Sequence, residues 1–284
     1  MPALHARSIT VTRGPHLVLD SVDVTLTPTR RIGVVGPNGV GKSTLLSALA
    51  GMVPIDTGTI RLTPPTATVG YLPQERERSA TETVAELLAR RTGVSGANAA
   101  LTAATAALAV GDDGADDTYA AAFDRWLALG GADLDSRVGV VWAELGLAAR
   151  LLDQPTASLS GGEAARAGLA ALALSRYDVY LLDEPTNDLD LDGLERLERW
   201  IDGLQAPVAL VSHDRTFLAR TISHVVELDE FSHRASEFAG GWAGYLEESR
   251  RHAVMPGSGT RNSMPNGATW LAARNESASG RVKA

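Results

Sequence analysis

Residues 36–44, GPNGVGKST, combine glycines, a lysine and two hydroxyl side chains at a spacing that suits a phosphate chain. They fit the pattern G-x-x-x-x-G-K-[ST]. Glycines let successive backbone N–H groups turn toward one ligand, and a following helix adds the positive end of its dipole. The residues predicted to surround the phosphates are Gly36, Pro37, Asn38, Gly39, Val40, Gly41, Lys42, Ser43 and Thr44.

Lysine is rare in this chain, which has 24 arginines but only Lys42 and Lys283. Keeping lysine in this loop suits a phosphate site, where a compact charge on a flexible stem is useful. We expect Lys42 to reach the β- and γ-phosphates and the Ser43 hydroxyl to bind Mg²⁺. The other interpretation is a glycine turn that matches by chance. The apolar run 31–35 before the loop and the helical pattern after it argue against that.

A second stretch, residues 177–184 (YDVYLLDE), is a hydrophobic run that ends in two carboxylates. Asp183, at the end of the predicted strand, suits a Mg²⁺ ligand because this hard cation prefers oxygen. Glu184 suits a general base, or a group that positions an attacking water. An acidic pair after a strand is weak evidence alone, and the phosphate loop in the same chain strengthens it.

A third stretch, residues 159–163 (LSGGE), places serine and glycines just before a helical pattern. Such a helix start can bind an anion. The simpler interpretation is an N-cap, in which Ser160 only opens the helix. The residues themselves leave both interpretations open.

The order of the predicted elements indicates an α/β fold with a mainly parallel core sheet and an antiparallel β layer. The antiparallel layer comes from strands 4–13 and 17–26, with short strands near 58–62 and 67–71 further on. The core elements are strands 31–35, 178–182, 207–211, 224–228 and 235–238 and helices 162–175, 190–204 and 214–220. Ligands of such sheets bind at the carboxyl ends of the strands, where the charged motifs fall.

The middle of the chain, about 79–157, reads as an inserted helical subdomain. Ser79 and Glu82 fit a capping box before a helix that carries Val84, Leu87 and Leu88. An alanine-rich helix at 97–110 ends near Gly111. In the next helix Tyr119, Phe123, Trp126 and Leu127 fall on one face, which we expect to pack in the core rather than bind a ligand.

Composition sets limits on the protein class. With 284 residues and 44% hydrophobic residues, the chain can bury a substantial core. It has no run approaching the roughly 20 apolar residues of a membrane span and no signal-peptide core at its start, and it has no cysteine, so a cytoplasmic protein is expected. The net charge of −8 does not suggest a general nucleic-acid binder. Residues 253–284, rich in Gly, Ser, Asn and Pro, are expected to form a disordered tail.

Taken together, the motifs resemble the nucleotide-binding domain of ATP-binding cassette (ABC) proteins, over about residues 5–250. GPNGVGKST, LSGGE and LLDEPTNDLD occur in the family's order. The resemblance implies a P-loop ATPase domain at 1–252 with Mg²⁺ as cofactor. It implies that Gln74, in YLPQ, contacts Mg²⁺ and the γ-phosphate region, that residues 187–190 form the D-loop, and that His213, in VSHDR, touches the γ-phosphate.

The resemblance also implies partners. In this family ATP sits between the phosphate loop of one cassette and the LSGGE segment of another. Ser160, Gly161, Gly162 and Glu163 would then act in trans, on a second copy or a related chain. EPTNDLD, SHDRTFL and the segment FAGGWAGYLE at 238–247 resemble the first cassette of ABC-F proteins. That group implies a cytoplasmic ATPase acting on the ribosome, including members that give antibiotic resistance.

Three departures from the ABC-F pattern stand out. The chain has one cassette, whereas ABC-F proteins have two cassettes joined by a charged helical linker. Residues 244–252 resemble the start of that linker. Asp188 replaces the usual histidine. Arg13 stands where an aromatic residue would stack on adenine, although a guanidinium can also stack on a base.

Two other function classes remain possible. One is the ATPase subunit of a transporter, but the motif EPTNDLD differs from the EPTSALD that is usual in transporter cassettes. The other is a structural-maintenance or DNA-repair ATPase, but only 117 positions separate Ser43 from Ser160, too few for the long coiled coils of that class. The acidic body is in tension with ribosome binding, since phosphate contacts normally use lysine and arginine. The residues from 250 onward differ, because they have six basic side chains and one acidic one, a net charge of +5. Residues 1–249 therefore carry a net charge of −13, and the whole chain carries −8.

Overall fold

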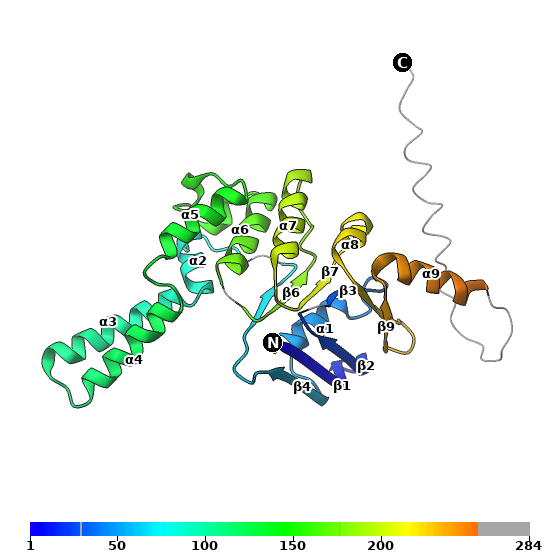
Figure 1. Ribbon diagram of the computed structural model, residues 1–284, viewed down its shortest axis with the longest axis horizontal. Coiled ribbons are helices and arrows are strands. Elements are labelled where there is room, and N and C mark those ends of the chain that lie inside the picture. Colours follow the sequence, from blue (N-terminus) through cyan, green and yellow to red (C-terminus); the bar gives the residue numbers. More distant parts are fainter. Residues whose placement is uncertain (29, 76, 176, 255–284) are drawn as a thin grey trace, which may run out of the picture.

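The computed structural model describes residues 1–28, 30–75, 77–175 and 177–254 and contains two β-sheets (Figure 1). The larger sheet has the strand order β5-β6-β7-β3-β8-β9, and all neighbours in it are parallel except β8 and β9. Its strands are β3 (Arg31–Val35), β5 (Val69–Leu72), β6 (Val179–Asp183), β7 (Val208–Val211), β8 (His224–Leu228) and β9 (Ala235–Ala239). The smaller, antiparallel sheet consists of β1 (Ala3–Arg13), β2 (His16–Leu26) and β4 (Thr57–Thr63). The tail expected at 253–284 lies outside the described residues from 255 onward.

The two faces of the larger sheet bury two separate hydrophobic cores, because side chains alternate along a strand. On one face Ile32, Val34 and Leu181 pack against helix α1 (Lys42–Leu49) and the smaller sheet. On the other face Leu182 and Leu210 belong to a core shared with several helices. Among these are α6 (Gly161–Leu174), α7 (Leu191–Gly203) and α8 (Arg215–Thr221). Helix α9 (Gly241–Val254) contacts α8, β8 and β9, and it lies beside α8 and β9 in Figure 1.

The parallel register brings four strand ends to one level. Asp183 at the end of β6 pairs with Val211 at the end of β7, and Val34 of β3 pairs with the same Val211. On the far side of β6, Leu72 at the end of β5 pairs with Leu182. The four loops that follow these strands therefore begin side by side, which confirms the predicted α/β architecture and fixes where a ligand can sit.

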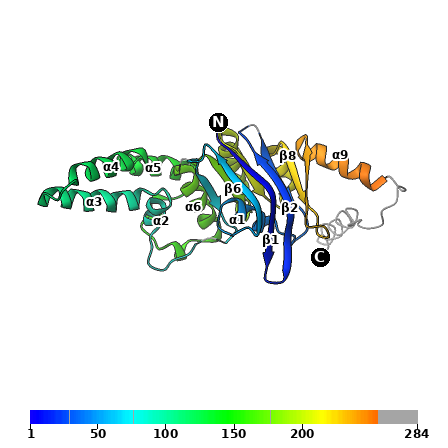
Figure 2. The ribbon, with the colours of Figure 1, turned by 90° about the horizontal axis from the view of Figure 1, so that it is seen from below.

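The middle of the chain is helical, and part of it extends away from the sheets (Figures 1 and 2). Its elements are α2 (Val84–Arg91), α3 (Val94–Val110), α4 (Ala115–Ala128), α5 (Leu134–Glu144) and the 3₁₀ turns Ala149–Leu151 and Thr156–Ser158. Helices α3 and α4 form the extended hairpin. The tilt between α2 and α3 is 78°, and together they have the length and composition of a membrane span, whereas no single helix of the described residues does.

The aromatic face of α4 is not in the core, so that expectation is wrong. Tyr119, Phe123 and Trp126 stack in sequence, with ring centroids 6.0 and 6.1 Å apart. However, Phe123 is 37% exposed and Leu127 is 45% exposed, and only Trp126 packs against the main core. The reason is that the hairpin is only two helices thick, so no third layer covers the face.

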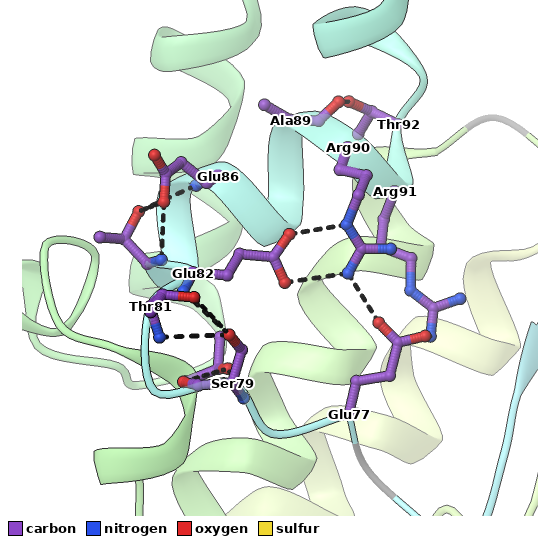
Figure 3. Close-up of polar contacts among 11 residues, drawn as sticks. Glu77, Ser79, Thr81, Glu82, Glu86, Ala89, Arg90, Arg91 and Thr92 are labelled. Carbon is purple, nitrogen blue, oxygen red and sulfur yellow. Dashed lines mark hydrogen bonds and ion pairs between the residues drawn. The ribbon is translucent and has the colours of Figure 1, made fainter.

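The start of α2 also differs from the prediction. The N-cap is Thr83, whose hydroxyl accepts from the Glu86 N–H at 3.3 Å, while the Glu86 carboxylate accepts from the Thr83 N–H at 2.8 Å. Glu82 does not cap the helix but forms an ion pair with Arg90, which also binds Glu77 (Figure 3). Residues 79–82 and 83–86 both fit the capping pattern, and the burial of Val84 together with the Arg90 partner selects the second.

Candidate functional site

The loop at residues 36–41 joins β3 to α1 and needs glycine at two packed positions. Gly36 and Gly41 have φ values of 144° and 113°. A β-carbon at Gly36 would lie 2.6 Å from the Leu228 carbonyl oxygen, and one at Gly41 would lie 2.8 Å from Val18 Cγ1. Gly41 is the N-cap of α1 and makes no side-chain cap hydrogen bond. The first N–H groups of α1 thus lack a side-chain cap and can bind an anion.

Lys42 lies folded across this loop. Its Nζ donates to the carbonyl oxygens of Gly36 and Pro37, each at 2.9 Å. Burial lowers the pKa of Lys42, while the carboxylates of Glu184 and Asp183 raise it. The ammonium group therefore faces two acidic side chains and is held by loop carbonyls that an anionic ligand can replace.

Glu184 is the buried centre of the site, with an exposed fraction of 3%. Its Oε1 lies 3.1 Å from His213 Nε2, and its Oε2 accepts from the His213 N–H at 3.3 Å. Burial raises the pKa of Glu184, and His213 lowers it. Glu184 also has a φ of 50°, a conformation that costs a non-glycine residue about 1–3 kcal/mol and is concentrated at functional sites.

Asp183 is buried as well, at 1% exposed, and belongs to a chain of hydroxyl contacts. The Tyr71 hydroxyl donates to Asp183 Oδ2 at 3.4 Å and lies 3.0 Å from Ser47 Oγ. Burial raises the pKa of Tyr71. Neither Tyr71 nor Ser47 was predicted from the sequence to belong to the site. The available signals were the spacing of Ser47 four residues after Ser43 and the position of Tyr71 on the strand that neighbours β6.

The donor set of the site suits Mg²⁺. Ser43, Gln74 and Asp183 offer hydroxyl, amide and carboxylate oxygens, the ligand type that this ion prefers. Ser43 and Gln74 are exposed, whereas Asp183 is buried. Among the described residues no group of three or more His, Cys, Asp or Glu could hold a metal alone.

The LSGGE segment forms the N-terminus of α6 and is capped by its own side chains. The Ser160 hydroxyl accepts from the Glu163 N–H at 3.3 Å, and the Glu163 carboxylate accepts from the Ser160 N–H at 2.9 Å and its hydroxyl at 2.8 Å. A β-carbon at Gly161 would lie 3.1 Å from Asp188 Cγ, and one at Gly162 would lie 2.9 Å from the Asp188 carbonyl oxygen. The contacts described for Ser160–Glu163 do not reach the phosphate loop.

The two unusual residues have clear positions. Asp188 has a φ of 65°, in the left-handed region where both aspartate and histidine are enriched. An aspartate at this position can therefore adopt the same backbone conformation as a histidine. Arg13 is exposed at the tip of the β1–β2 hairpin. Val18 and Leu19 of that hairpin pack against Gly41, and the positive charge of Arg13 tends to lower the pKa of Tyr71. The hairpin that carries Arg13 therefore packs against the phosphate loop.

Comparison with known proteins agrees with this geometry. The family described as ABC transporter matches residues 19–187. The chain is 35% identical over 249 residues to the tylosin resistance ATP-binding protein TlrC of Streptomyces fradiae, covering 86% of this chain and 45% of TlrC. It is 32% identical over 253 residues to the energy-dependent translational throttle protein EttA of Mycobacterium tuberculosis, covering 86% of this chain and 43% of EttA.

The chain spans less than half the length of these curated relatives. Among solved structures, an ATP-binding subunit of an ABC transporter shares the fold, with a TM-score of 0.65 and 19% identity over 90% of this chain and 95% of that one. The chain therefore belongs to the ABC transporter family as an ABC-type ATPase domain that binds ATP and is related to ABC-F proteins.

Proposed function

We propose that this domain hydrolyses ATP with Mg²⁺ in a site that a second cassette completes, and that closure of the pair acts on the ribosome. The observation that carries the hydrolytic part is the buried Glu184 carboxylate. Both of its oxygens face His213, and it lies at the strand ends beside the phosphate loop and Lys42. A base held in this way can act on a water aligned with a bound γ-phosphate.

In the proposed reaction Lys42 leaves the carbonyls of Gly36 and Pro37 and binds the β- and γ-phosphates. Glu184 accepts a hydrogen bond from the attacking water and takes its proton, because a buried carboxylate with a raised pKa is a better base than an exposed one. The water oxygen bonds to the γ-phosphorus as the bond to the oxygen of the leaving ADP breaks. His213, with 62% of its side chain exposed, is free to turn toward the γ-phosphate.

Ser43, Gln74 and Asp183 are the residues proposed to hold Mg²⁺. When bound, the ion neutralises charge on the β- and γ-phosphates. The remaining site residues come from the second cassette, whose Ser160, Gly161, Gly162 and Glu163 would cover the γ-phosphate. In a symmetric pair of identical chains the two sites would be equivalent.

Support for the ribosomal part comes from the relatives. One is named a tylosin resistance protein and another a translational throttle protein. The acidic cassette does not favour contact with RNA over its whole surface. A localised contact therefore fits better than general electrostatic attraction.

The experiment that tests the proposal uses Glu184→Gln, which keeps the size and a hydrogen-bonding oxygen but removes the base. We expect ATP hydrolysis to fall about 10²–10⁴-fold while ATP binding persists. The variant should elute as a dimer with ATP and Mg²⁺ on a sizing column. An ATP-bound variant that stays monomeric would refute the dimeric site.

Sedimentation with ribosomes tests the remaining part. Glu184→Gln should pellet with ribosomes only when ATP is present, and Lys42→Ala is the matched control that should not. If Glu184→Gln does not pellet with ribosomes in ATP and a membrane protein co-purifies with the chain, the transporter alternative is supported.

A further inference from the structure

We propose that Tyr71 is a positioning residue for the metal site, because its hydroxyl links Ser47 of α1 to the Asp183 carboxylate of β6. This inference rests on the proposed role of Asp183 at Mg²⁺. It concerns a side chain that lies three residues before Gln74 and that would not itself touch nucleotide or metal.

The backbone register places Tyr71 for this role. Tyr71 of β5 pairs with Leu181 of β6, two residues before Asp183. Side chains two residues apart on a strand share a face. Tyr71, Leu181 and helix α1 all belong to the same side of the larger sheet. The Tyr71 side chain therefore lies between the strand that carries Asp183 and the helix that carries Ser43.

The direction of the hydrogen bonds follows from the chemistry of the groups. An ionised carboxylate can only accept, so the Tyr71 O–H points to Asp183 Oδ2, at 3.4 Å. Its phenolic oxygen can then accept from the Ser47 hydroxyl, at 3.0 Å. The Ser47 contact is close to the usual length and holds the phenol, whereas the Asp183 contact is longer than usual and has room to shorten.

The helix geometry connects this chain to the metal. Ser43 and Ser47 are four residues apart in α1 and lie on one face of the helix. Ser43 and Asp183 are the two residues proposed to bind the ion from α1 and β6. The contacts from Ser47 through Tyr71 to Asp183 hold α1 and β6 together and so fix the separation of Ser43 from Asp183. Partners of this kind typically change metal affinity about 10–100-fold when they are removed.

Tyr71→Phe tests the inference because it removes the hydroxyl and keeps the ring, which packs against the core on the α1 side of the sheet. Mn²⁺ binding to the ATP complex is measured by electron paramagnetic resonance, and ATP affinity is measured separately in EDTA. We expect Tyr71→Phe to weaken Mn²⁺ binding about 10-fold, with ATP affinity in EDTA unchanged. Ser47→Ala should weaken Mn²⁺ binding in the same direction, and the double variant should be less affected than the sum, as for residues of one network.

Tyr180→Phe is the matched control. Tyr180 is a buried tyrosine on β6 whose hydroxyl donates to the Ser175 carbonyl oxygen at 3.2 Å, so its loss removes a comparable hydrogen bond away from Asp183. Mn²⁺ affinity that is unchanged in Tyr71→Phe, or that falls equally in Tyr180→Phe, would overturn the inference. Asp183→Asn separates the two proposals. If Asp183→Asn leaves Mn²⁺ affinity unchanged, the metal site itself is wrong. If only Tyr71→Phe has no effect, the positioning role alone is wrong.

Discussion

Two helix N-termini in this domain, those of α1 and α6, carry glycine, at the N-cap of α1 and at the first two positions of α6, and the structure treats them differently. The N-cap of α1 is Gly41, which has no side chain to satisfy the first N–H groups. The N-cap of α6 is Ser160, which forms a complete capping box with Glu163. Where α1 presents a lysine ammonium, α6 presents a carboxylate.

This contrast shows that glycine at the start of a helix does not by itself make an anion site. The N–H groups of α1 have no competing side chain, so a phosphate can bind them directly. At α6 the Glu163 carboxylate already occupies the positive end of the helix dipole, where it is favourable. A phosphate presented to α6 must therefore share or displace that carboxylate, which fits a contact made only on closure of a pair.

Among substitutions at the two helix starts, the largest effect should come from Lys42→Ala, which removes the ammonium group from the α1 site. Removing one group that stabilises transition-state charge typically costs about 10²–10³-fold, and here ATP binding should weaken as well. Hydrolysis and the affinity of a fluorescent ATP analogue measure the two effects. A variant with normal affinity would show that backbone N–H groups alone hold the phosphates.

A smaller and different effect is expected of Ser160→Ala at α6. Losing a hydrogen bond to a charged group corresponds to about 10–100-fold in hydrolysis. ATP affinity of the monomer should be unchanged, because the contacts described for Ser160 do not reach the phosphate loop. Loss of the cap should also lower the free energy of unfolding by about 1 kcal/mol. Weaker ATP binding by the monomer would contradict the assignment in trans.

Matched glycine substitutions compare the backbones of the two sites. Gly41→Ala places a β-carbon against Val18 at a position whose φ is positive, which is unfavourable for alanine. This substitution should lower the free energy of unfolding by about 1–3 kcal/mol. Gly161→Ala sits at the first helical position, where alanine gains up to about 1 kcal/mol and the nearest atoms belong to the end of the Asp188 side chain. Its net effect should be smaller than that of Gly41→Ala. Urea unfolding of both variants measures the difference.

The smallest effect concerns pH. Backbone and side-chain hydrogen bonds from Ser160 lower the pKa of Glu163 below its ordinary value of 4.5. A lowered pKa means that the capping box stabilises the fold above pH 4.5 and loses this contribution as the pH falls through the folded-state pKa. Glu163→Gln should therefore be less stable than the unmodified protein at pH 7 and nearly equal to it in acid. Thermal unfolding at the two pH values checks this, and a constant difference would contradict it.

Much of the fold could be predicted because its signals are local. Strand and helix patterns placed nearly every core element, and the spacing of Gly36, Gly41 and Lys42 identified the phosphate loop. Local patterns failed where two solutions competed. The capping pattern fits both 79–82 and 83–86, and the Arg90 partner that separates them lies on another turn. The face of α4 has the periodicity of a core helix, but periodicity does not reveal whether a third layer covers it.

The sequence by itself determined which side chains could bind phosphates, a metal and a water, because those chemistries depend on residue types at short spacings. Only the tertiary structure decided which of them meet. The register of β3, β7, β6 and β5 brings Lys42, Asp183, Glu184 and His213 to one end of the sheet, although up to 171 positions separate Lys42 from His213. It also placed Tyr71 between Ser47 and Asp183. Contacts of this kind arise between strands and helices distant in the chain, and no local pattern encodes them.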